Sequence, residues 1–351
     1  MTTYRIAGIP GDGIGVDVTA EARKVLGRAA ELHHFGLEWT EFDWSCERYT
    51  RTGTLMPDDG IEQLSAFDAI LLGAVGFPGV PDHVSLWGLL IPVRRAFAQY
   101  VNLRPVRLLP GTTSVLAGRT AAELEMVIVR ENSEGEYSTI GGRHNRGRPD
   151  EFALQEAVFT RAGVERIVRY AFDLARTRSG RVCSATKSNG IVHTMPFWDE
   201  IFAEVAAGYP DVAAEQCHID ALAARMVQQP GRLDVVVASN LFGDILSDLA
   251  AAVTGGLGMA PSGNINPERE FPSMFEAVHG SAPDIAGQGI ANPVAQVLTA
   301  AMMLRQLGED AAAAAVEGAV EKVLADGAVR TPDLGGRSTT AELGSAIAAA
   351  L

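Results

Sequence analysis

The sequence predicts an α/β fold in which buried strands alternate with amphipathic helices. Strand-like apolar runs, such as Leu233–Ala238, are followed almost throughout by segments with a helical spacing of apolar residues. Polar and charged residues come directly after several of these runs, for example in Ser239–Asp248. Ligands bind at the carboxyl edge of α/β sheets, so this order of residues also predicts a binding crevice there.

Two strands and two helices are expected near the N-terminus. Tyr4–Ile9 is a short apolar run that leads through a glycine-rich turn into the helix Val16–Ala30. Ala69–Leu72 is a second buried run, and the helix Ser85–Tyr100 follows it. Gly and Pro cluster at residues 73–81 between them, which predicts a mobile loop.

Strands and helices continue to alternate in the middle of the chain. The strands are expected at Glu125–Val129, Arg181–Ala185 and Asp234–Ala238, and the helices at Arg161–Arg176, Met195–Ala207 and Leu241–Val253. Asn240 is the predicted N-cap of the last of these helices. Gly and Pro also cluster at residues 141–149, which predict an arm or hairpin, and at residues 255–267, which predict a hinge or ligand loop.

The C-terminal third is predicted to be helical. Apolar and alanine-rich segments indicate helices at Pro293–Leu307 and Asp310–Leu324. A last helix is expected after Thr339, because Thr339 with Glu342 three residues later forms a capping-box pattern.

Composition limits the possible partners and the compartment. The 351 residues, 47% of them hydrophobic, suffice for two domains or one large one. A net charge of −14 argues against nucleic acid as a partner. No apolar run approaches the roughly 18–20 residues of a membrane span, and no signal peptide is evident. Three widely separated cysteines fit a reduced cytoplasm, so a cytoplasmic protein is expected.

Gly11, Gly13 and Gly15 resemble a dinucleotide fingerprint, because they follow a strand and open a helix. Their spacing is GxGxG rather than GxGxxG, and no acidic residue stands in a convincing context about 20 residues later. A turn that packs tightly is an equally good explanation of these glycines.

Asp244 and Asp248 are the most informative acidic pair. Their spacing places two carboxylates on one helix face, at the border of an apolar arc that includes Leu241, Ile245 and Leu249. A Mg²⁺ or Mn²⁺ ion between the carboxylates would relieve their repulsion. Asp220 could complete a set of three oxygen ligands. A solvated helix face with two acids is the alternative, which spacing alone does not exclude.

Several arginines point to an anionic substrate. Arg94, Arg95, Arg104 and Arg130 lie at predicted strand ends or on a helix beside one. Guanidinium groups bind carboxylates bidentately, so a cluster of them predicts a substrate with two or more carboxylates. Each arginine taken alone is better explained by a surface ion pair.

Two further groups could carry out proton transfer and cofactor binding. Lys187, just after a predicted strand, could act as a general base, and Tyr137 could donate a proton. A solvated lysine and a half-buried tyrosine are the alternative.

His279–Asp284, with Asn292 downstream, is a segment of small residues that a ligand could approach closely. Asp284 would accept hydrogen bonds from a ribose diol and repel a 2′-phosphate, which favours NAD over NADP.

Four segments together resemble the β-decarboxylating dehydrogenases, the family of isopropylmalate, isocitrate, homoisocitrate and tartrate/D-malate dehydrogenases. Residues 9–15 read IPGDGIG, residues 102–105 read NLRP, residues 240–248 read NLFGDILSD and residues 278–287 read VHGSAPDIAG. The resemblance extends nearly from end to end. It implies the two-domain isopropylmalate dehydrogenase-like fold, which is not a Rossmann fold although it binds NAD.

The resemblance also implies a role for each candidate residue. Arg94, Arg104 and Arg130 would hold the substrate carboxylates. Asp244 and Asp248, with Asp220 from a partner subunit, would hold Mg²⁺ or Mn²⁺. Lys187, also from the partner, would take the hydroxyl proton, and Tyr137 would protonate the enol carbon. The implied cofactor-binding residues are His279, Gly280, Ser281, Ala282, Asp284 and Asn292.

The same resemblance implies a homodimer with shared active sites and a division into two domains. Residues 1–99 and 255–351 would form the NAD-binding domain, and residues 100–254 a central domain with the dimer interface and the metal ligands.

The segment before Arg94 is expected to select the substrate. Trp87 and Gly88 resemble the tartrate/D-malate branch, as do residues 44–47 (WSCE) and 81–86 (PDHVSL). Leu90 offers no hydroxyl for a third carboxylate, whereas Leu89 and Leu90 could form the apolar surface that isopropylmalate enzymes use. Pro92 departs from the branch pattern and is expected to kink or reset the helix.

The expected reaction is NAD-dependent, metal-assisted oxidative decarboxylation of D-malate, with tartrate as a further substrate, to a 2-oxo acid and CO₂. Two alternatives stay open: 3-isopropylmalate or another 2-hydroxy diacid as the substrate, and a non-catalytic regulatory relative. The second requires the loss of a key residue, but Tyr137, Lys187, Asp244 and Asp248 are all present.

Overall fold

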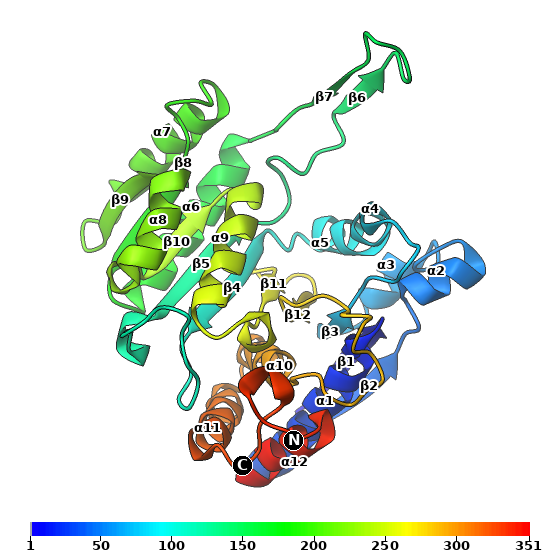
Figure 1. The fold of residues 1–351 in the computed structure, drawn as a ribbon. Coiled ribbons are helices and arrows are strands. Elements are labelled where there is room, and N and C mark those ends of the chain that lie inside the picture. The colour runs from blue at the N-terminus through cyan, green and yellow to red at the C-terminus, as the bar shows by residue number, and fades with distance from the viewer. Residues whose placement is uncertain (1) are drawn as a thin grey trace.

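A ten-stranded sheet runs through the molecule, and helices pack against it (Figure 1). The computed structural model describes residues 2–351. The strands are β1 (Thr3–Gly11), β2 (Gly36–Glu41), β3 (Ala69–Ala74), β4 (Val101–Arg107), β5 (Glu125–Glu131), β6 (Gly141–His144), β7 (Phe152–Gln155), β8 (Arg181–Thr186), β9 (Ala213–His218), β10 (Val235–Ala238), β11 (Gly263–Ile265) and β12 (Ser273–Glu276). The α-helices are α1 (Ile14–His33), α2 (Cys46–Thr52), α3 (Gly60–Leu64), α4 (Asp82–Ser85), α5 (Ile91–Ala96), α6 (Arg161–Arg176), α7 (Thr194–Ala206), α8 (Ile219–Gln228), α9 (Asn240–Val253), α10 (Val294–Leu307), α11 (Asp310–Asp326) and α12 (Thr340–Ala350). Short 3₁₀ turns occur at Ala121–Glu123, Pro230–Arg232, Leu257–Met259 and Pro332–Leu334.

The two ends of the chain build one half of the sheet, and the middle of the chain builds the other. The strand order is β2-β1-β3-β12-β11-β4-β5-β10-β8-β9. Neighbouring strands are parallel except at the centre, where β11 is antiparallel to both β12 and β4, and β4 is antiparallel to β5. The chain enters the middle half at β4 and returns to the terminal half at β11, and these two strands are direct neighbours. The architecture confirms the predicted α/β class.

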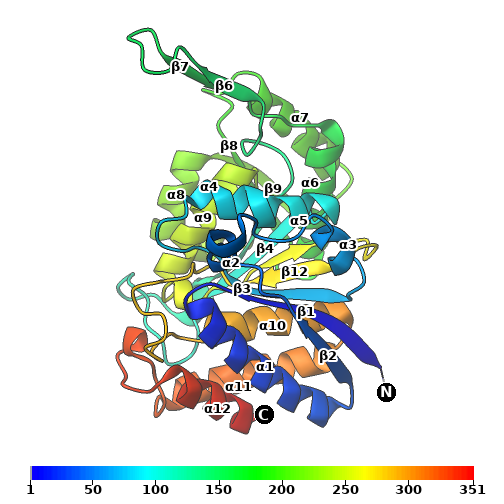
Figure 2. The same cartoon turned by 90° about the vertical axis from the view of Figure 1, so that its right-hand side faces the viewer.

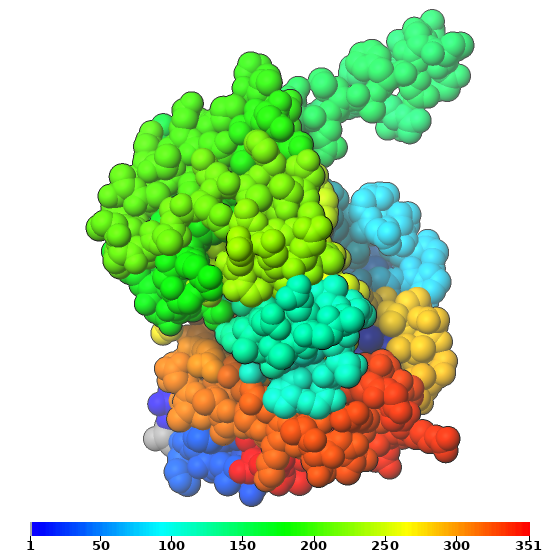
Figure 3. All heavy atoms as spheres, turned by 60° about the vertical axis from the view of Figure 1, so that its left-hand side comes forward, coloured from blue at the N-terminus to red at the C-terminus, as the bar shows by residue number. Residues whose placement is uncertain are grey.

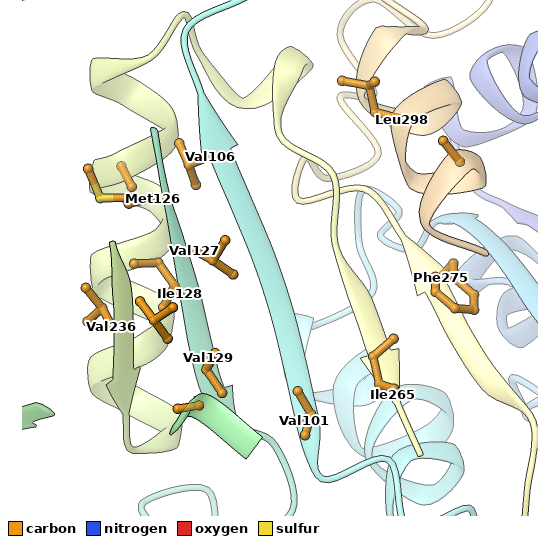
Figure 4. Close-up of a cluster of buried hydrophobic side chains, with 14 of the residues drawn as sticks. Val101, Val106, Met126, Val127, Ile128, Val129, Val236, Ile265, Phe275 and Leu298 are labelled. Carbon is orange, nitrogen blue, oxygen red and sulfur yellow. The ribbon is translucent and has the colours of Figure 1, made fainter. Parts of the chain in front are cut away.

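Buried side chains line both faces of the central strands. Along β3, Leu71 belongs to the main core, whereas Leu72 belongs to a second cluster that also contains Ile9. Burial of both faces is typical of strands in a mostly parallel sheet. In Figure 4 the main core extends from Val236 on β10 across β5 and β4 to Phe275 on β12, so the two halves share one core.

Helices pack in groups on each half of the sheet. In the terminal half, α1, α10, α11 and α12 pack against one another, and α1 and α10 contact β3 (Figure 2). In the middle half, α6 packs beside α7 and contacts β5, β8 and β10. The second pair, α8 and α9, lies against the same strands, with α9 on β4 and β5. α9 therefore begins at the carboxyl end of β10, beside the centre of the sheet.

The hairpin of β6 and β7 projects away from the body of the molecule (Figures 1 and 3). It confirms the predicted arm or hairpin at residues 141–149. Phe152 and Leu154 on this arm are 55% and 53% exposed. An arm that carries exposed apolar side chains has little to bury them against within one chain.

Most predicted elements are present, and α6 has the predicted ends. The helix predicted at Ser85–Tyr100 is present with different ends: helical backbone runs without a break from α4 through a π-helical turn at Leu86–Leu90 to the end of α5 at Ala96. Pro92, near the start of α5, has no N–H for the regular ladder. In the turn just before it, the N–H of Ile91 bonds the carbonyl of Leu86, five residues back. Residues 255–267 are also more regular than predicted, since they include β11.

Candidate active site

Helix α9, which carries the acidic pair, is capped from another segment. Its N-cap is Ser239 rather than the predicted Asn240, and no side-chain bond from within the helix caps it. The hydroxyl of Ser239 donates to Glu136, and the backbone N–H of Leu241 donates to the other carboxylate oxygen of Glu136 at 3.0 Å. Glu136 therefore fixes the loop after β5, with Tyr137 in it, beside the start of α9.

Asn240 orients Arg130 instead of capping the helix. Its side-chain oxygen accepts hydrogen bonds from Nε and Nη2 of Arg130 at 3.1 and 2.8 Å. Gly243, one turn further along α9, makes room for this arginine, because a Cβ at position 243 would lie 2.6 Å from Cβ of Arg130. The glycine in the NLFGD segment thus allows β5 and α9 to approach closely.

Asp244 is the centre of the polar contacts. It accepts hydrogen bonds from Nη1 of Arg130 and from the hydroxyl of Tyr137, the latter at 2.9 Å. Nη1 of Arg104 lies 3.5 Å from one carboxylate oxygen of Asp244 and 3.5 Å from one of Asp248. The two acids therefore share a helix face, and both reach solvent, with side chains that are 35% and 58% exposed. Ile245 between them is 53% exposed, so the apolar arc of α9 is not buried throughout.

The environment shifts the pKa values of the two acids in opposite directions. Burial acts to raise the pKa of Asp244, but Arg130 and Arg104 outweigh it, and the pKa lies below its ordinary value. Burial raises the pKa of Asp248, and the charge of Asp244 adds to this effect. A cation beside both carboxylates would favour the charged form of each. The oxygen donors of this pair suit Mg²⁺ or Mn²⁺.

The three predicted substrate arginines are brought together in the interior. Burial lowers the pKa of Arg130 to about 10, with a further contribution from Arg104. Arg104 lies in the middle of β4 and donates to Ser247 at 2.5 Å. The Nε atoms of Arg94 and Arg104 are buried without a hydrogen-bond partner. Unpartnered buried donors are rare, and an anionic ligand would satisfy them.

Arg94 has an acidic partner that the sequence analysis missed. Its Nη2 donates to Glu276 at 2.6 Å, and the two side chains are only 8% and 12% exposed. Asn264 also donates to Glu276, at 2.8 Å, and Arg94 and Asn264 together lower its pKa despite burial, which acts to raise it. Glu276 ends β12 just upstream of the segment 278–287. An acidic residue at the end of a buried strand was the available signal.

Tyr137 lies between the acidic pair and the arginines. Burial raises the pKa of its hydroxyl, and Asp244 raises it further, so the phenol keeps its proton in neutral solution. The guanidinium of Arg130 lies 5.6 Å from the centre of its ring. Its position therefore suits proton donation.

Lys187 and Asp220 form a separate pair. Nζ of Lys187 lies 2.8 Å from Asp220, and this bond lowers the pKa of the carboxyl. Lys187 follows β8, and Asp220 is in the first turn of α8. Within residues 2–351, no three His, Cys, Asp or Glu side chains gather as metal ligands. One chain therefore does not bring Asp220 to Asp244 and Asp248.

The segment from His279 to Asp284 packs on the glycine-rich turn. The N–H of Ile14 donates to the carbonyl of Ser281 at 2.8 Å. Gly13 has φ +58°, and a Cβ there would lie 2.0 Å from the same carbonyl oxygen. The glycines are thus explained by a tight packed turn rather than by the dinucleotide fingerprint.

The outer side of this segment remains accessible. Nε2 of His279 is buried without a partner, whereas its Nδ1 lies 3.0 Å from the carbonyl of Gly280. A Cβ at Gly280 would meet open space. Ala282 adopts a positive φ of 38°, and Asp284 is exposed. An unsatisfied imidazole nitrogen and an exposed carboxylate fit a ligand rich in hydroxyl and amine groups, such as the adenosine half of a dinucleotide.

Asn292 is engaged within the chain. Its side-chain nitrogen donates to Asp333 at 2.9 Å and to the sulfur of Met259 at 3.3 Å, and its oxygen accepts from the N–H of Val294. It therefore holds the turn around Asp333 against the start of α10.

The segment before Arg94 forms the π-helical turn. Trp87 and Leu90 are half-buried, but Leu89 is fully buried in the second core cluster with Ile9. Leu89 cannot contribute the apolar surface suggested for it, so Leu90 and Trp87 are the remaining candidates in this turn.

Comparisons with known proteins show which family the chain resembles. The sequence profile of "Isocitrate/isopropylmalate dehydrogenase" matches residues 5–347. The chain is 55% identical over 355 residues to the D-malate dehydrogenase [decarboxylating] of Escherichia coli. This alignment covers 99% of the chain and 98% of the relative. The chain is 53% identical over 354 residues to the tartrate dehydrogenase/decarboxylase of Pseudomonas putida, with 98% and 97% covered.

A solved structure confirms the predicted isopropylmalate dehydrogenase-like fold. Isocitrate dehydrogenase from Methylococcus capsulatus superposes with a TM-score of 0.89 at 37% identity and covers 99% of both chains. The chain therefore belongs to the isocitrate/isopropylmalate dehydrogenase family.

Proposed function

We propose that the protein oxidises D-malate with NAD and decarboxylates it to a 2-oxo acid, with tartrate as a further substrate. The observation that carries this proposal is the meeting of Arg104, Arg130, Tyr137 and Asp248 around Asp244. The relatives above, at 55% and 53% identity, are decarboxylating enzymes named for D-malate and tartrate.

In this proposal the arginines bind the two substrate carboxylates. The unpartnered Nε atoms of Arg94 and Arg104 supply donors that the chain itself leaves unused. Asp244 and Asp248 would hold a divalent cation together with Asp220 of a second chain. When bound, the cation acts as a Lewis acid toward the carbonyl that forms and the enolate that develops from it.

Two residues would move protons. Oxidation removes a hydride from C2 and a proton from its hydroxyl, and Lys187 is the base that takes this proton. Loss of CO₂ leaves an enol, and Tyr137 protonates its carbon. The pKa of Tyr137 is raised, so its hydroxyl is protonated when the enol forms.

NAD would bind along His279–Asp284, with Gly280, Ser281 and Ala282 close to its adenosine half. Asp284 is exposed and available to a ribose diol. A 2′-phosphate would be repelled by the same carboxylate, so NAD is preferred over NADP. Asn292 would act indirectly, by holding the turn around Asp333.

A homodimer completes the site in this proposal. Lys187 and Asp220 lie together, with side chains 30% and 69% exposed, so a partner chain could bring its arginines and acids to them. Ile245 and Val192 are 53% and 66% exposed, and burial in an interface would remove them from water. The halves at 1–99 plus 255–351 and 100–254 would be two domains with the substrate between them.

A cytoplasmic location is part of the same proposal. The three cysteines are free and buried, which suits a reducing compartment. None of the helices in residues 2–351 is long and apolar enough to cross a membrane.

A substrate panel tests the proposal. Purified protein with NAD or NADP, and with Mn²⁺, Mg²⁺ or EDTA, would be assayed for reduced cofactor with D-malate, L-tartrate, 3-isopropylmalate, isocitrate and homoisocitrate. We expect the highest kcat/KM with D-malate, NAD and Mn²⁺ or Mg²⁺. If kcat/KM for 3-isopropylmalate were much higher than for D-malate, the proposed substrate would be wrong. Equal use of NADP and NAD would refute the role of Asp284.

A further inference from the structure

We propose that Arg95 is a positioning residue: it holds the backbone of Tyr137 to the π-helical turn that carries Trp87. The proposal rests on the proposed function, since it assumes that Tyr137 transfers a proton during turnover. Arg95 itself contacts neither Asp244 nor Asp248, so the role differs from that of the neighbouring Arg94.

The contacts of Arg95 bridge the two halves of the molecule. Its Nη2 donates to the backbone carbonyl of Tyr137 at 3.0 Å. Its guanidinium carbon lies 5.4 Å from the ring centre of Trp87, within the range of a cation–π interaction. Trp87 and Arg95 belong to the terminal half, whereas Tyr137 follows β5 of the middle half. Arg95 therefore joins the two halves at Tyr137, a residue of the candidate site.

The π-helical turn places Trp87 and Arg95 on one face. Eight residues of a regular α-helix rotate by about 800°, which leaves two side chains about 80° apart. A π-helical turn accommodates one extra residue, so the separation behaves as seven residues, or about 700°, only about 20° short of two full turns. The π-helical turn before Pro92 thus produces the alignment that lets Arg95 reach the Trp87 ring.

Tyr137 is consequently held at both ends. Asp244 accepts a hydrogen bond from its hydroxyl, and Arg95 donates one to its carbonyl. The first bond comes from the middle half and the second from the terminal half. Without Arg95 the hydroxyl keeps its partner and Glu136 still holds the loop to α9, but the carbonyl of Tyr137 loses its bond to the terminal half, which carries Arg94. A small displacement of a proton donor slows the step that needs it.

The test compares Arg95→Met with a matched control, Arg23→Met. Arg23 is also an arginine of the terminal half stacked on a tryptophan, with its guanidinium carbon 4.8 Å from the Trp39 ring. It pairs with Glu41 and lies away from the site. Steady-state kinetics and amide hydrogen exchange of the peptide 134–141 would be measured for both variants and for Arg95→Lys, which keeps the positive charge and one donor nitrogen.

We expect Arg95→Met to lower kcat for D-malate about tenfold, with KM for D-malate and NAD changed less than about twofold, because Arg95 acts on geometry rather than on binding. Exchange in the peptide 134–141 should rise about tenfold without ligands. Arg95→Lys should recover part of both effects, and Arg23→Met should match the wild type in both.

The outcomes separate this inference from the proposed function. If the wild type does not turn over D-malate, the proposed function fails, and unchanged exchange in Arg95→Met then also overturns the link to Tyr137. If the wild type is active, a normal kcat in Arg95→Met overturns the positioning role. A fall in kcat without faster exchange overturns it as well, because the backbone of Tyr137 would then not have been released.

Discussion

At the residue scale, Asp244 joins more of the candidate site than any single sequence pattern indicates. It accepts from Arg130 and Tyr137 and lies within 3.5 Å of Arg104. Replacing Asp244 by asparagine keeps one acceptor oxygen but removes the charge. The variant should therefore still fold, while its binding of a cation is weakened.

We expect Asp244→Asn to lower kcat at least about 100-fold, the scale of losing one preorganised electrostatic group. Binding of Mn²⁺, followed by titration calorimetry, should be lost, whereas circular dichroism should show a folded protein. The exposed Asp310 on α11 supplies the control variant Asp310→Asn, which should behave as the wild type. Full activity with an unchanged response to Mn²⁺ in Asp244→Asn would remove the metal site from this pair.

His279 gives a prediction about pH. Burial lowers the pKa of His279 below its ordinary value of 6.5. As the pH falls, the unfolded state therefore takes up this proton at a higher pH than the folded state does. Its contribution to stability is therefore present above about pH 6.5 and is lost as the pH falls through the folded pKa. The free energy of unfolding in urea should fall less between pH 7.5 and pH 5.5 in His279→Gln than in the wild type.

The control for this experiment is His83→Gln, which changes an exposed histidine of the same half. Its pH dependence should follow that of the wild type. An equally steep loss of stability in His279→Gln and in the wild type would show that another group is responsible.

The sequence identified the site residues by type, but not their partners. Asp244 and Asp248 were recognisable from local spacing, and Arg94, Arg104 and Arg130 from their charge near strand ends. Glu276 and Ser247 were missed, since each acquires its role from an arginine far away in the chain. Asn240 was seen but misread as a cap, because a local pattern cannot reveal that Glu136 already occupies that role.

At the element scale, helix ends illustrate which local signals are reliable. The capping box predicted at Thr339 is present: Glu342 accepts from the N–H and hydroxyl of Thr339 at 2.7 and 3.0 Å, and the N–H of Glu342 donates to that hydroxyl at 3.2 Å. All three contacts are local, which explains why the sequence pattern sufficed.

Thr339→Ala should destabilise the protein by about 1 kcal/mol, because it removes the side-chain half of this cap. Urea unfolding followed by circular dichroism would measure the change. Thr113→Ala, at an exposed threonine with no side-chain contact of this kind among the described residues, should have an effect close to zero. Equal stabilities of the two variants would mean that α12 does not depend on its cap.

Other elements depend on contacts that the sequence does not display locally. The edge strand β2 is mostly polar or half-buried, so the apolar pattern did not reveal it. β11 has three residues and lies in a Gly/Pro-rich segment that predicted a loop. It becomes a strand because β4 and β12 bond it from both sides. A long amphipathic helix such as α6 has no such dependence, and α6 was predicted with both of its ends.

At the scale of the whole molecule, the separation of the Lys187–Asp220 pair from Asp244 predicts complementation between chains. If the protein is the proposed homodimer, Lys187→Ala and Asp244→Asn should each be inactive alone. A mixed dimer would contain one intact site, made of Asp244 from the first chain and Lys187 from the second. Random re-association of equal amounts should therefore restore about a quarter of wild-type activity, because about half of the dimers are mixed and each has one of two sites.

Mixing each variant with itself is the control and should restore nothing. The subunit composition would be followed by native mass spectrometry of chains that carry different tags. Mixed dimers without activity would place both residues in the same site of one chain and contradict the shared active site.

The central position of β4 and β11 has a mechanical consequence. Val101 of β4 pairs with Ile265 of β11, so the ladder of hydrogen bonds is unbroken where the chain passes between the halves. Any change in the angle between the two halves must then be absorbed as added or reduced twist of a continuous sheet, distributed over several strands rather than concentrated in a flexible linker. In the proposed reaction, the halves would open by such a twist to release product, and β4 and β11 would keep their register throughout.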